Sequence, residues 1–443
     1  TASTTDPVAS GETITNTQEA TSANAIKAWK NADGSTTAPA GATVVYTLYA
    51  DGTTTSYTVT LDGTADTAPT VTGGYESVGW TATFINLPKY KTGTTTEIVY
   101  TIAETTTYPG YTASTTDPVA SGETITNTQG ATKVFAKKAW KNADGSETAP
   151  EGATVVYKLY ADGVEKLTVE LDGNVDETPT STNGYESEAW TATFINLPET
   201  KIVNGAAVSI VYTISETVTY PGYTPQNPYI KVGTGSTITN SQDETEVYAL
   251  KAWKNAAGTT DAPQGGQVTY TLYADGVATS YTVTLDGTAD TALTVTGGYE
   301  SEAWKAMFVH LPKYKIVNGE AVEIEYTIAE STAYPGYTAS TTAPVASGST
   351  ITNTQVATEA NALKAWVNAD GSKTAPEGAT VVYTLYADGT ATSYTVTLDG
   401  TVDETVPTTT AGYESEAWKA MFVHLPKYKI VNGEAVEIEY TIA

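Results

Sequence analysis

Three polar residue types recur at fixed positions along this chain, and together they have the chemistry to form a covalent cross-link between side chains. A lysine opens the sequence K-A-W, a glutamate closes Y-T-I-x-E, and an asparagine closes T-I-T-N. In the first full copy they are Lys27, Glu104 and Asn127, separated by 77 and 23 residues. The same set recurs with nearly the same spacing in two further copies, as Lys138, Glu216 and Asn240 and as Lys251, Glu330 and Asn353.

These side chains are complementary if the fold buries them together. A lysine amine in apolar surroundings loses its proton, because burial disfavours the charged form, and the neutral amine is a nucleophile. A buried glutamic acid likewise stays protonated, so it can polarise the asparagine carboxamide and pass a proton to the leaving ammonia. The predicted product is an amide between lysine Nζ and asparagine Cγ. It is made once in each folded copy, without an external enzyme.

Alternation along the predicted strands indicates that all three side chains point inward. Glu104 shares the parity of the apolar Ile102, Asn127 that of Ile125, and Lys27 that of the tryptophan in its own K-A-W. Successive side chains of a strand point to opposite faces, so each polar group lies on an apolar face. Such an arrangement is costly unless the three groups meet. The alternative is a buried network of the same residues without a covalent bond.

The spacing of the four K-A-W lysines predicts an array of whole domains. These lysines lie 111, 113 and 113 residues apart, whereas solenoid repeats run about 20–50 residues. Each copy is therefore long enough to bury its own core. The predicted boundaries are 1–20 for the closing strand of a preceding repeat with its linker, then 21–129, 130–242, 243–355 and 356–443 for repeats 1 to 4, the last without its closing strand.

Each repeat is predicted to be a β-sandwich. Threonine, tyrosine and valine suit pleated, half-buried surfaces, and no window shows a helical period of useful length. In repeat 1 the expected strands are 43–50, 56–61, 80–85 and 97–103. Turn signals separate them, at Asp33-Gly34, Asp51-Gly52, Asp62-Gly63, Gly73-Gly74 and Leu87-Pro88. Short strands with regular turns predict an antiparallel sandwich of about seven strands per repeat.

Composition disfavours several classes of function. The chain has 22 basic and 50 acidic residues, for a net charge of −28, and therefore repels nucleic acid and anionic membrane surfaces. It has no cysteine, so it has neither disulfides nor thiolate metal sites. We expect no cofactor, no metal and no membrane insertion within this sequence. No serine-histidine-acid set, phosphate loop or HExxH pattern is present, so we do not expect an enzyme that turns over a substrate.

The motifs together resemble CnaB-type domains, the collagen-binding-protein B-like domains of Gram-positive surface adhesins and pilins. The similarity rests on K-A-W at 27–29, Y-x-L-Y-A-D-G at 46–52, F-I-N-L-P-K at 84–89, Y-T-I-A-E at 100–104, P-G-Y at 109–111 and T-I-T-N-T at 124–128. The resemblance implies inverse immunoglobulin-like sandwiches, each with an intramolecular isopeptide bond. The cross-linked pairs would be Lys27 with Asn127, Lys138 with Asn240 and Lys251 with Asn353, and Glu104, Glu216 and Glu330 would be the proton shuttles.

The expected function is that of a structural stalk or fibre shaft. The resemblance places it outside the cell on a Gram-positive surface, anchored to the cell wall through segments beyond this sequence. Its partners would be neighbouring repeats of the same polypeptide or neighbouring chains in a fibre. The alternative is a binding module for a host matrix protein or glycan. Near-identical repeats favour the stalk, because a binding module would more often show one divergent copy.

The two ends of the sequence carry complementary pieces of a repeat. Residues 1–17 are identical to 112–128, so Asn16 has no lysine before it, and the fourth copy stops at Ala443, before its glutamate and asparagine. We expect this stretch to be a register-shifted section of a longer array, with Asn16 and Lys364 unpaired. A strand like that around Asn16, from the continuing polypeptide or a neighbouring chain, would complete the fourth sandwich.

Overall fold

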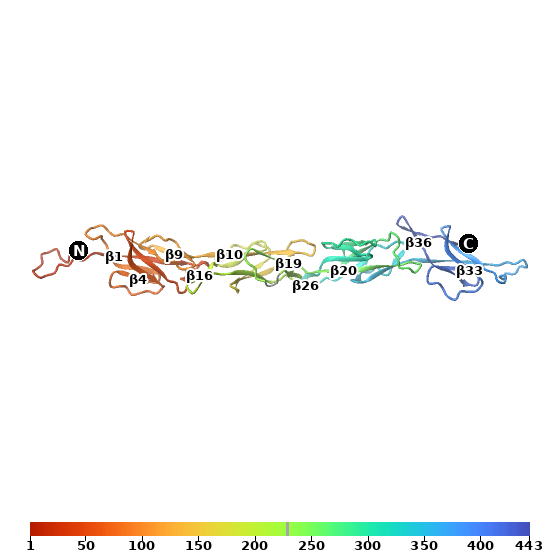
Figure 1. Ribbon diagram of the computed structural model, residues 1–443, viewed down its shortest axis with the longest axis horizontal. Helices are drawn as coiled ribbons and strands as arrows, with labels where there is room; N and C mark the ends of the chain where they lie inside the picture. The colour runs from red at the N-terminus through yellow and green to blue at the C-terminus, as the bar shows by residue number, and fades with distance from the viewer. Residues whose placement is uncertain (227–229) are drawn as a thin grey trace. The chain divides into compact units, whose positions relative to one another are not determined.

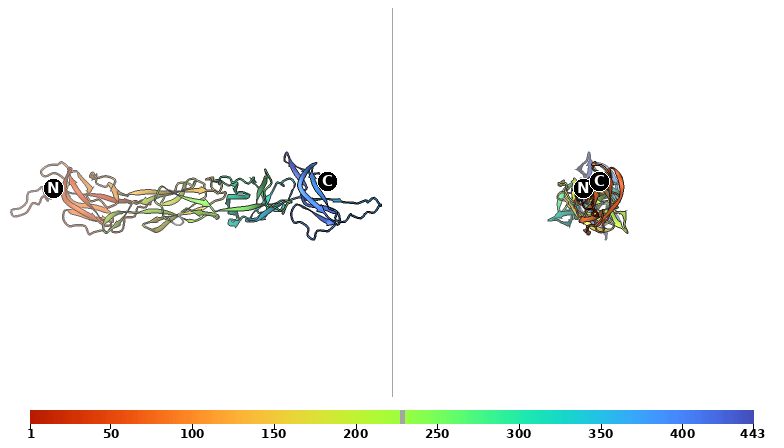
Figure 2. Two further views of the ribbon diagram at one scale, coloured as in Figure 1. Left: turned by 45° about the vertical axis from the view of Figure 1, so that its right-hand side comes forward. Right: turned by 90° about the vertical axis from the view of Figure 1, so that its left-hand side faces the viewer.

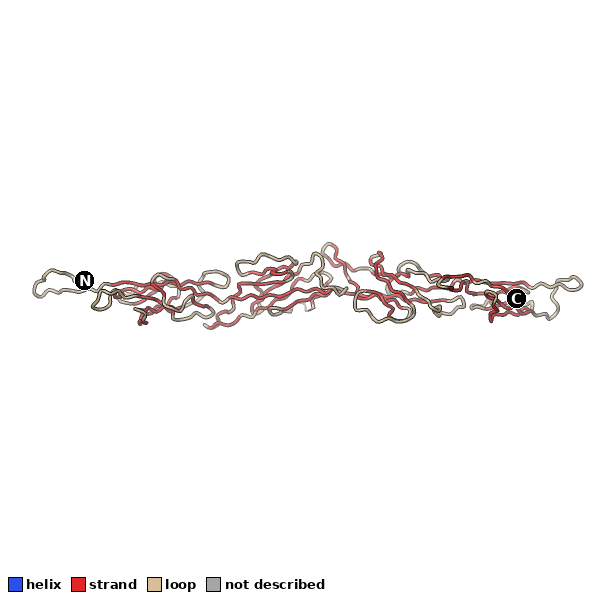
Figure 3. The backbone as a smooth tube through the Cα atoms, turned by 90° about the horizontal axis from the view of Figure 1, so that it is seen from above, coloured by secondary structure: helices blue, strands red, loops and turns tan. Residues whose placement is uncertain are grey.

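The computed structural model describes residues 1–226 and 230–443, and this part of the chain is built of strands and loops without a helix (Figures 1 and 3). The prediction of an all-β protein is therefore confirmed. Contacts divide the chain into two compact units. The first comprises Thr1–Ala139, Ala149–Tyr220 and Pro225–Asn240, and the second comprises Trp140–Thr148, Pro221–Thr224 and Ser241–Ala443. The repeat boundaries given above remain a prediction, and the repeats are described one by one.

Repeat 1 is a sandwich of two sheets. Its strands are β1 Ala20–Lys30, β2 Val44–Ala50, β3 Thr53–Leu61, β4 Gly73–Val78, β5 Thr81–Pro88, β6 Tyr100–Glu104, β7 Tyr111–Ala113, β8 Val119–Ala120 and β9 Thr124–Gln129. One sheet has the order β4-β5-β1-β9-β7 and the other the order β3-β2-β6-β8. In the first sheet β1 is central, antiparallel to β5 and parallel to β9. The first and last strands of the repeat are therefore direct neighbours.

The observed strands correct several sequence-based expectations. Nine strands replace the expected seven in this repeat, because short pieces such as β7 and β8 close the sheet edges. Trp80 does not start a strand: it lies in a turn with φ of 67°, and β5 begins one residue later. Gly73-Gly74 is not a turn but the start of β4. A Cβ on Gly74 would lie 2.6 Å from the ring of Phe84, so this glycine is needed for close packing.

Repeats 2 and 3 share the five-stranded sheet of repeat 1, whereas their second sheets have the orders β12-β11-β17 and β22-β21-β27-β29, and each has an additional two-stranded sheet, β15-β16 or β25-β26. Repeat 2 contains β10 Ala131–Lys141, β11 Val155–Ala161, β12 Val164–Leu171, β13 Asn183–Glu188, β14 Thr191–Pro198, β15 Thr200–Val203, β16 Ala206–Ser209, β17 Tyr212–Val218, β18 Tyr223–Pro225 and β19 Ser236–Gln242. Repeat 3 contains β20 Glu244–Lys254, β21 Val268–Ala274, β22 Val277–Leu285, β23 Gly297–Glu302, β24 Lys305–Pro312, β25 Tyr314–Val317, β26 Glu320–Glu323, β27 Tyr326–Glu330, β28 Tyr337–Ala339, β29 Val345–Ala346 and β30 Thr350–Gln355. Their five-stranded sheets have the orders β13-β14-β10-β19-β18 and β23-β24-β20-β30-β28.

Repeat 4 has smaller sheets in this chain. Its strands are β31 Ala357–Leu363, β32 Val381–Ala387, β33 Thr390–Leu398, β34 Ala411–Glu416, β35 Lys419–Pro426, β36 Tyr428–Val431, β37 Glu434–Glu437 and β38 Tyr440–Ile442. The sheet orders are β31-β35-β34, β33-β32-β38 and β36-β37. Lys364 lies just beyond the end of β31. Leu363, which precedes it, is 69% exposed.

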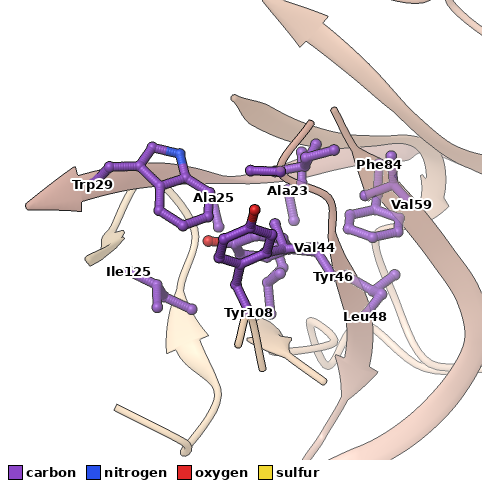
Figure 4. Close-up of a cluster of buried hydrophobic side chains, with 14 of the residues drawn as sticks. Ala23, Ala25, Trp29, Val44, Tyr46, Leu48, Val59, Phe84, Tyr108 and Ile125 are labelled. Carbon is purple, nitrogen blue, oxygen red and sulfur yellow. The ribbon is translucent and has the colours of Figure 1, made fainter. Parts of the chain in front are cut away.

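The core of repeat 1 lies between its two sheets. Trp29 on β1 and Phe84 on β5 belong to one sheet, and Tyr46 on β2 belongs to the other. In the close-up of Figure 4, Trp29 and Phe84 lie at opposite ends of the cluster, with Tyr108 between them and Ile125 on the side of Trp29. All five are at most 8% exposed. Burying an aromatic or large aliphatic side chain contributes about 1.5–3 kcal/mol, so a single sandwich has a substantial core of its own.

The first seventeen residues lie outside the sheets. This segment forms a loop that projects from the first sandwich, in red in Figures 1 and 2, and is closed by the bridge between Ala2 and Asn16. The Thr17 backbone N–H donates to the Thr1 carbonyl oxygen at 2.7 Å. The segment is mostly exposed, although its sequence copy at 112–128 forms three strands of repeat 1.

Candidate cross-linking sites

The fold brings the three predicted residues of repeat 1 together from two facing sheets. Lys27 lies on β1 and Asn127 on β9, which are adjacent parallel strands with Lys27 opposite Ile125 and Trp29 opposite Asn127. Glu104 is the last residue of β6, in the other sheet. The alternation of β1, with every second side chain buried, points the lysine into the space between the sheets.

One carboxylate contacts both the amine and the carboxamide. Lys27 Nζ lies 3.0 Å from Glu104 Oε2, and Asn127 Nδ2 donates to Glu104 Oε1 at 2.7 Å. Lys27 Nζ also donates to the backbone oxygen of Ile125 at 3.1 Å, which holds the amine beside β9. The lysine and glutamate side chains are 0% and 2% exposed, and Asn127 is 1% exposed. The three groups therefore form a dry cluster with the carboxylate at its centre.

The same geometry is repeated in the next two copies. In repeat 2 the distance from Lys138 Nζ to Glu216 Oε2 is 3.4 Å, and Asn240 Nδ2 donates to Glu216 Oε1 at 2.6 Å. In repeat 3 the corresponding distances are 3.0 Å and 2.6 Å, among Lys251, Glu330 and Asn353. The lysine side chain is 0% exposed in both copies. Sequence drift elsewhere in the repeats thus leaves this cluster unchanged.

Aromatic rings cover the amine. In repeat 1 the ring of Trp29 lies 5.0 Å from Lys27 Nζ, and the edges of Trp80, Tyr108 and Tyr111 pack around that indole with centroid distances of 5.2–5.4 Å. In repeat 3 the equivalent indole is 4.8 Å from its lysine. The rings exclude water from the amine, which strengthens the electrostatic effects of the cluster.

Burial shifts the pKa values of the three lysines and of Glu216 in the direction that favours their neutral forms. Burial lowers the pKa of Lys27 and of Lys251, and in both cases the neighbouring glutamate opposes the shift without cancelling it. For Lys138 burial lowers the pKa to about 8, against the same opposition from Glu216. Burial also raises the pKa of Glu216. In repeat 2 the lowered lysine pKa and the raised glutamate pKa reduce the free-energy cost of moving one proton from the amine to the carboxylate, which would yield the nucleophile and the acid together.

The asparagine carbonyl oxygen is left without a donor in all three clusters. Oδ1 of Asn127, Asn240 and Asn353 is buried and accepts no hydrogen bond from the described residues. A buried acceptor without a partner costs about 1–3 kcal/mol, so native proteins rarely keep one. Attack at Cγ would place negative charge on this oxygen, and the glutamate carboxyl group contacts the same carboxamide through Nδ2.

Every repeat also contains a buried carboxylate outside the lysine-asparagine clusters, which the sequence pattern did not predict. Glu76 is 0% exposed, and its carboxylate accepts the backbone N–H groups of Asp62, Gly63 and Trp80 at 2.6–3.0 Å. The Trp80 carbonyl oxygen in turn accepts the N–H of Lys27 at 2.8 Å. The equivalent residues are Glu186, Glu300 and Glu414. The only signal in the sequence was the recurring G-Y-E-S, and the neighbouring backbone donors become visible only in the structure.

The residues predicted to be unpaired lie apart from any such cluster. Asn16 is exposed in the N-terminal loop. Lys364 has its Nζ 5.1 Å from the ring of Trp366, and no carboxylate of the described chain forms an ion pair with it. Among the described residues, no group of three or more histidine, cysteine, aspartate or glutamate side chains is arranged to hold a metal ion. The same part of the chain has no helix long and apolar enough to cross a membrane.

Comparison with protein-family models identifies the domains that contain the three complete clusters. The model of the Cna protein B-type domain matches residues 23–128, 134–241 and 247–354, which together make up more than half of the chain. The chain belongs to this family. Each matched Cna protein B-type domain contains one complete lysine, glutamate and asparagine set. Lys364 and the N-terminal loop lie outside the three matches.

Solved structures of similar proteins include the two B repeat units of the collagen binding protein Cna of Staphylococcus aureus, at 26% identity, covering 96% of this chain and 93% of that one with a TM-score of 0.28. The Bacillus anthracis TIE protein is 17% identical, covering 96% of this chain and 73% of that one with a TM-score of 0.37. The shaft pilin SpaA of Lactobacillus rhamnosus GG is 13% identical over 51% of this chain and 98% of its own, with a TM-score of 0.19. A search of curated proteins finds no match.

Proposed function

We propose that this chain is a structural stalk of a Gram-positive cell surface, stiffened by one lysine-asparagine isopeptide bond in each of three repeats. The bonds join Lys27 to Asn127, Lys138 to Asn240 and Lys251 to Asn353. The observation that carries the proposal is the position of a single buried carboxylate against both reactive groups, with its oxygens 3.0 Å from the amine nitrogen and 2.7 Å from the carboxamide nitrogen in repeat 1. Membership of the Cna protein B-type family supports a structural role rather than enzymatic turnover.

The proposed reaction balances within each cluster. In repeat 1, Glu104 takes a proton from the Lys27 ammonium, and the neutral Nζ attacks Cγ of Asn127 while the carboxylic acid polarises the side-chain carbonyl. The Nζ–Cγ bond forms and the Cγ–Nδ2 bond breaks. The carboxyl group returns its proton to Nδ2 and carries a second proton from Nζ to it, so that the nitrogen leaves as ammonium and Glu104 ends as the carboxylate it began as. Folding supplies the close approach, and no cofactor enters.

The bond lies where tension along the chain would act. The polypeptide enters repeat 1 through β1 and leaves it through β9, and these strands are parallel neighbours. Pulling on the two ends shears β1 along β9, which loads their hydrogen bonds together. A covalent link between Lys27 and Asn127 would carry that load and shield the residues between them. An uninterrupted series of such links suits a stalk or fibre shaft.

The same proposal implies a cellular location and a set of partners for the chain. The stalk would lie outside the cell, held to the wall by segments beyond this sequence, and its partners would be adjacent repeats and neighbouring chains of a fibre. A negative charge of −28 without cysteine is compatible with an exported protein that uses another covalent bond in place of disulfides. Binding of a host matrix protein or glycan remains the alternative function for this chain.

Pulling single molecules by their ends tests the mechanical part of the proposal. About 100 residues lie between each bonded pair, and an extended chain spans at most about 3.3–3.6 Å per residue, so an unlinked repeat releases roughly 340 Å on unfolding. Repeats 1 to 3 should show no steps of this size. The Asn240→Ala variant should show one, from repeat 2 alone. Three full-length steps from the parent protein would overturn the proposal.

A further inference from the structure

Repeat 2 differs from the other repeats on the outward face of its central strand. Along β10 the exposed side alternates Lys133, Phe135 and Lys137, while the intervening residues are buried. With Thr191, Thr193 and the strand β13 these side chains line a groove of about 370 Å³. At a rise of about 3.3 Å per residue, the two lysines lie roughly 13 Å apart on either side of the aromatic ring.

The other repeats have different residue types at the same positions of the sheet. The residues equivalent to Lys133, Phe135 and Lys137 are Ser22, Asn24 and Ile26 in repeat 1, Glu246, Tyr248 and Leu250 in repeat 3, and Glu359, Asn361 and Leu363 in repeat 4. The strand register supports these equivalences, since Phe135 lies opposite Thr193 as Tyr248 lies opposite Met307. A pair of lysines flanking an aromatic ring therefore occurs only in repeat 2.

The groove is also open only because small residues face the aromatic ring. In repeat 3 the place of Thr191 is taken by Lys305, whose Nζ lies 4.9 Å from the ring of Tyr248 and 3.2 Å from Glu302 Oε1. That lysine covers the ring and is neutralised by its own carboxylate. In repeat 2 the ring of Phe135 keeps a free face.

The two lysines are unpaired in an acidic chain. Neither Lys133 nor Lys137 forms an ion pair with a carboxylate of the described residues, although the chain carries 50 acidic side chains. Glu188 is the one acidic residue that lines the groove. The groove thus has two lysines against one glutamate in a chain whose net charge is −28, and charge complementarity favours an anionic ligand.

The position of β10 within the sheet decides between a sugar and a peptide. β10 pairs with β14 on one side and β19 on the other, so its backbone groups are already used and a peptide cannot add to it as a new strand. A ligand that lies over Phe135 on the face of this central strand is therefore held by side chains. Those available are an aromatic face, ammonium groups and the hydroxyl-bearing side chains Tyr185, Ser187, Thr191 and Thr193. A sugar ring presents an apolar face to an aromatic ring and hydroxyls to polar neighbours.

We propose that this groove of repeat 2 binds an anionic oligosaccharide. The sugar ring packs on Phe135, and the sulfate or carboxylate groups of successive residues contact Lys133 and Lys137. This site is independent of the cross-links and adds a ligand-binding function to the stalk. Because the contacts lie at an exposed surface, binding weakens as salt is added.

The test is binding of defined probes to the whole chain at low ionic strength, measured by titration calorimetry. The anionic probes are hyaluronan oligosaccharides, which carry carboxylates only, and chondroitin sulfate oligosaccharides, which carry carboxylates and sulfates. Dextran tests an uncharged sugar, and polyglutamate tests an acidic peptide. We expect saturable binding of at least one of the two anionic sugars and none of dextran. Lys133→Glu with Lys137→Glu should weaken it at least tenfold, and Thr193→Met should do the same by filling the groove as in repeat 3.

A matched control tests whether the effect of the lysine substitutions is specific to the groove. Lys166→Glu with Lys201→Glu changes the net charge equally on other strands of repeat 2 and should leave binding within about twofold of the parent. Equal loss in this control would show that only overall charge matters and would overturn the proposal. Polyglutamate binding with the same dependence on Lys133 and Lys137 would assign the groove to an acidic peptide instead. If neither hyaluronan nor chondroitin sulfate binds, the proposal of an oligosaccharide site is also refuted.

Discussion

Replacing Asn240 by alanine removes one proposed bond and leaves the other two in place. The change takes away the carboxamide that is attacked, while Lys138 and Glu216 stay beside each other at 3.4 Å. The cross-link would close a loop of about 100 residues, and by analogy with a disulfide of that span its loss costs about 4.7 kcal/mol. Repeat 2 should therefore lose about 5 kcal/mol of unfolding free energy. If the parent had no cross-link, the variant would lose only the hydrogen bond from Asn240 to Glu216, which is worth about 1 kcal/mol.

Differential scanning calorimetry of the whole chain measures this loss. For a domain of about 100 residues, 1 kcal/mol shifts the melting temperature by about 4 °C, so the transition of repeat 2 should fall by roughly 20 °C while the others stay in place. Asn16→Ala is the matched control, because Asn16 closes the same T-I-T-N sequence but lies exposed and away from any lysine. A shift of only the 1 kcal/mol expected for the hydrogen bond would refute the covalent constraint.

The other predictions concern the acid, the pH dependence and the chain end. Glu104→Gln should stop bond formation in repeat 1 alone, which would be measured as loss of the cross-linked tryptic peptide of that repeat. The control Glu186→Gln changes a buried carboxylate that binds only backbone N–H groups, so this variant should keep all three bonds. In the unlinked Asn240→Ala protein the folded Lys138 has a pKa of about 8 against 10.5 for an ordinary lysine. Between these two pH values the unfolded chain binds more protons than the folded chain, so the unfolding free energy of repeat 2 should rise as the pH increases from about 8 to about 10.5. Calorimetry measures this gain, and the cross-linked parent should not show it at Lys138. If residues 1–17 complete the fourth repeat of a neighbouring chain, sedimentation should show concentration-dependent association that deletion of this segment abolishes; unchanged association after deletion would contradict the exchange.

The period of the sequence and its alternation predicted the fold class and the inward direction of the key side chains. A spacing near 113 residues required whole domains, and the parity of Glu104 with Ile102 placed the glutamate on a core face, as the structure has it with 2% of the side chain exposed. These features depend on local geometry, which the strand period fixes. The cross-link itself is still a prediction.

The remaining features depend on contacts between distant segments. Gly74 reads as a turn residue, yet it is needed in β4 because the ring of Phe84 covers it. Trp80 reads as a strand residue, yet the buried carboxylate of Glu76 holds its backbone N–H in a turn with positive φ. The parallel pairing of β1 with β9 was likewise not predicted, since strand order within a sheet has no local signal. These features are determined by the packing of the whole sandwich.

Intact mass spectrometry of the purified, folded chain tests the central claim most directly, because each lysine-asparagine bond expels one ammonia. We expect a mass below that of the sequence by three ammonia molecules. After correction for the substitution, the deficit should fall to two ammonia molecules in Asn240→Ala and stay at three in Asn16→Ala. A folded parent protein with the full sequence mass would contradict it.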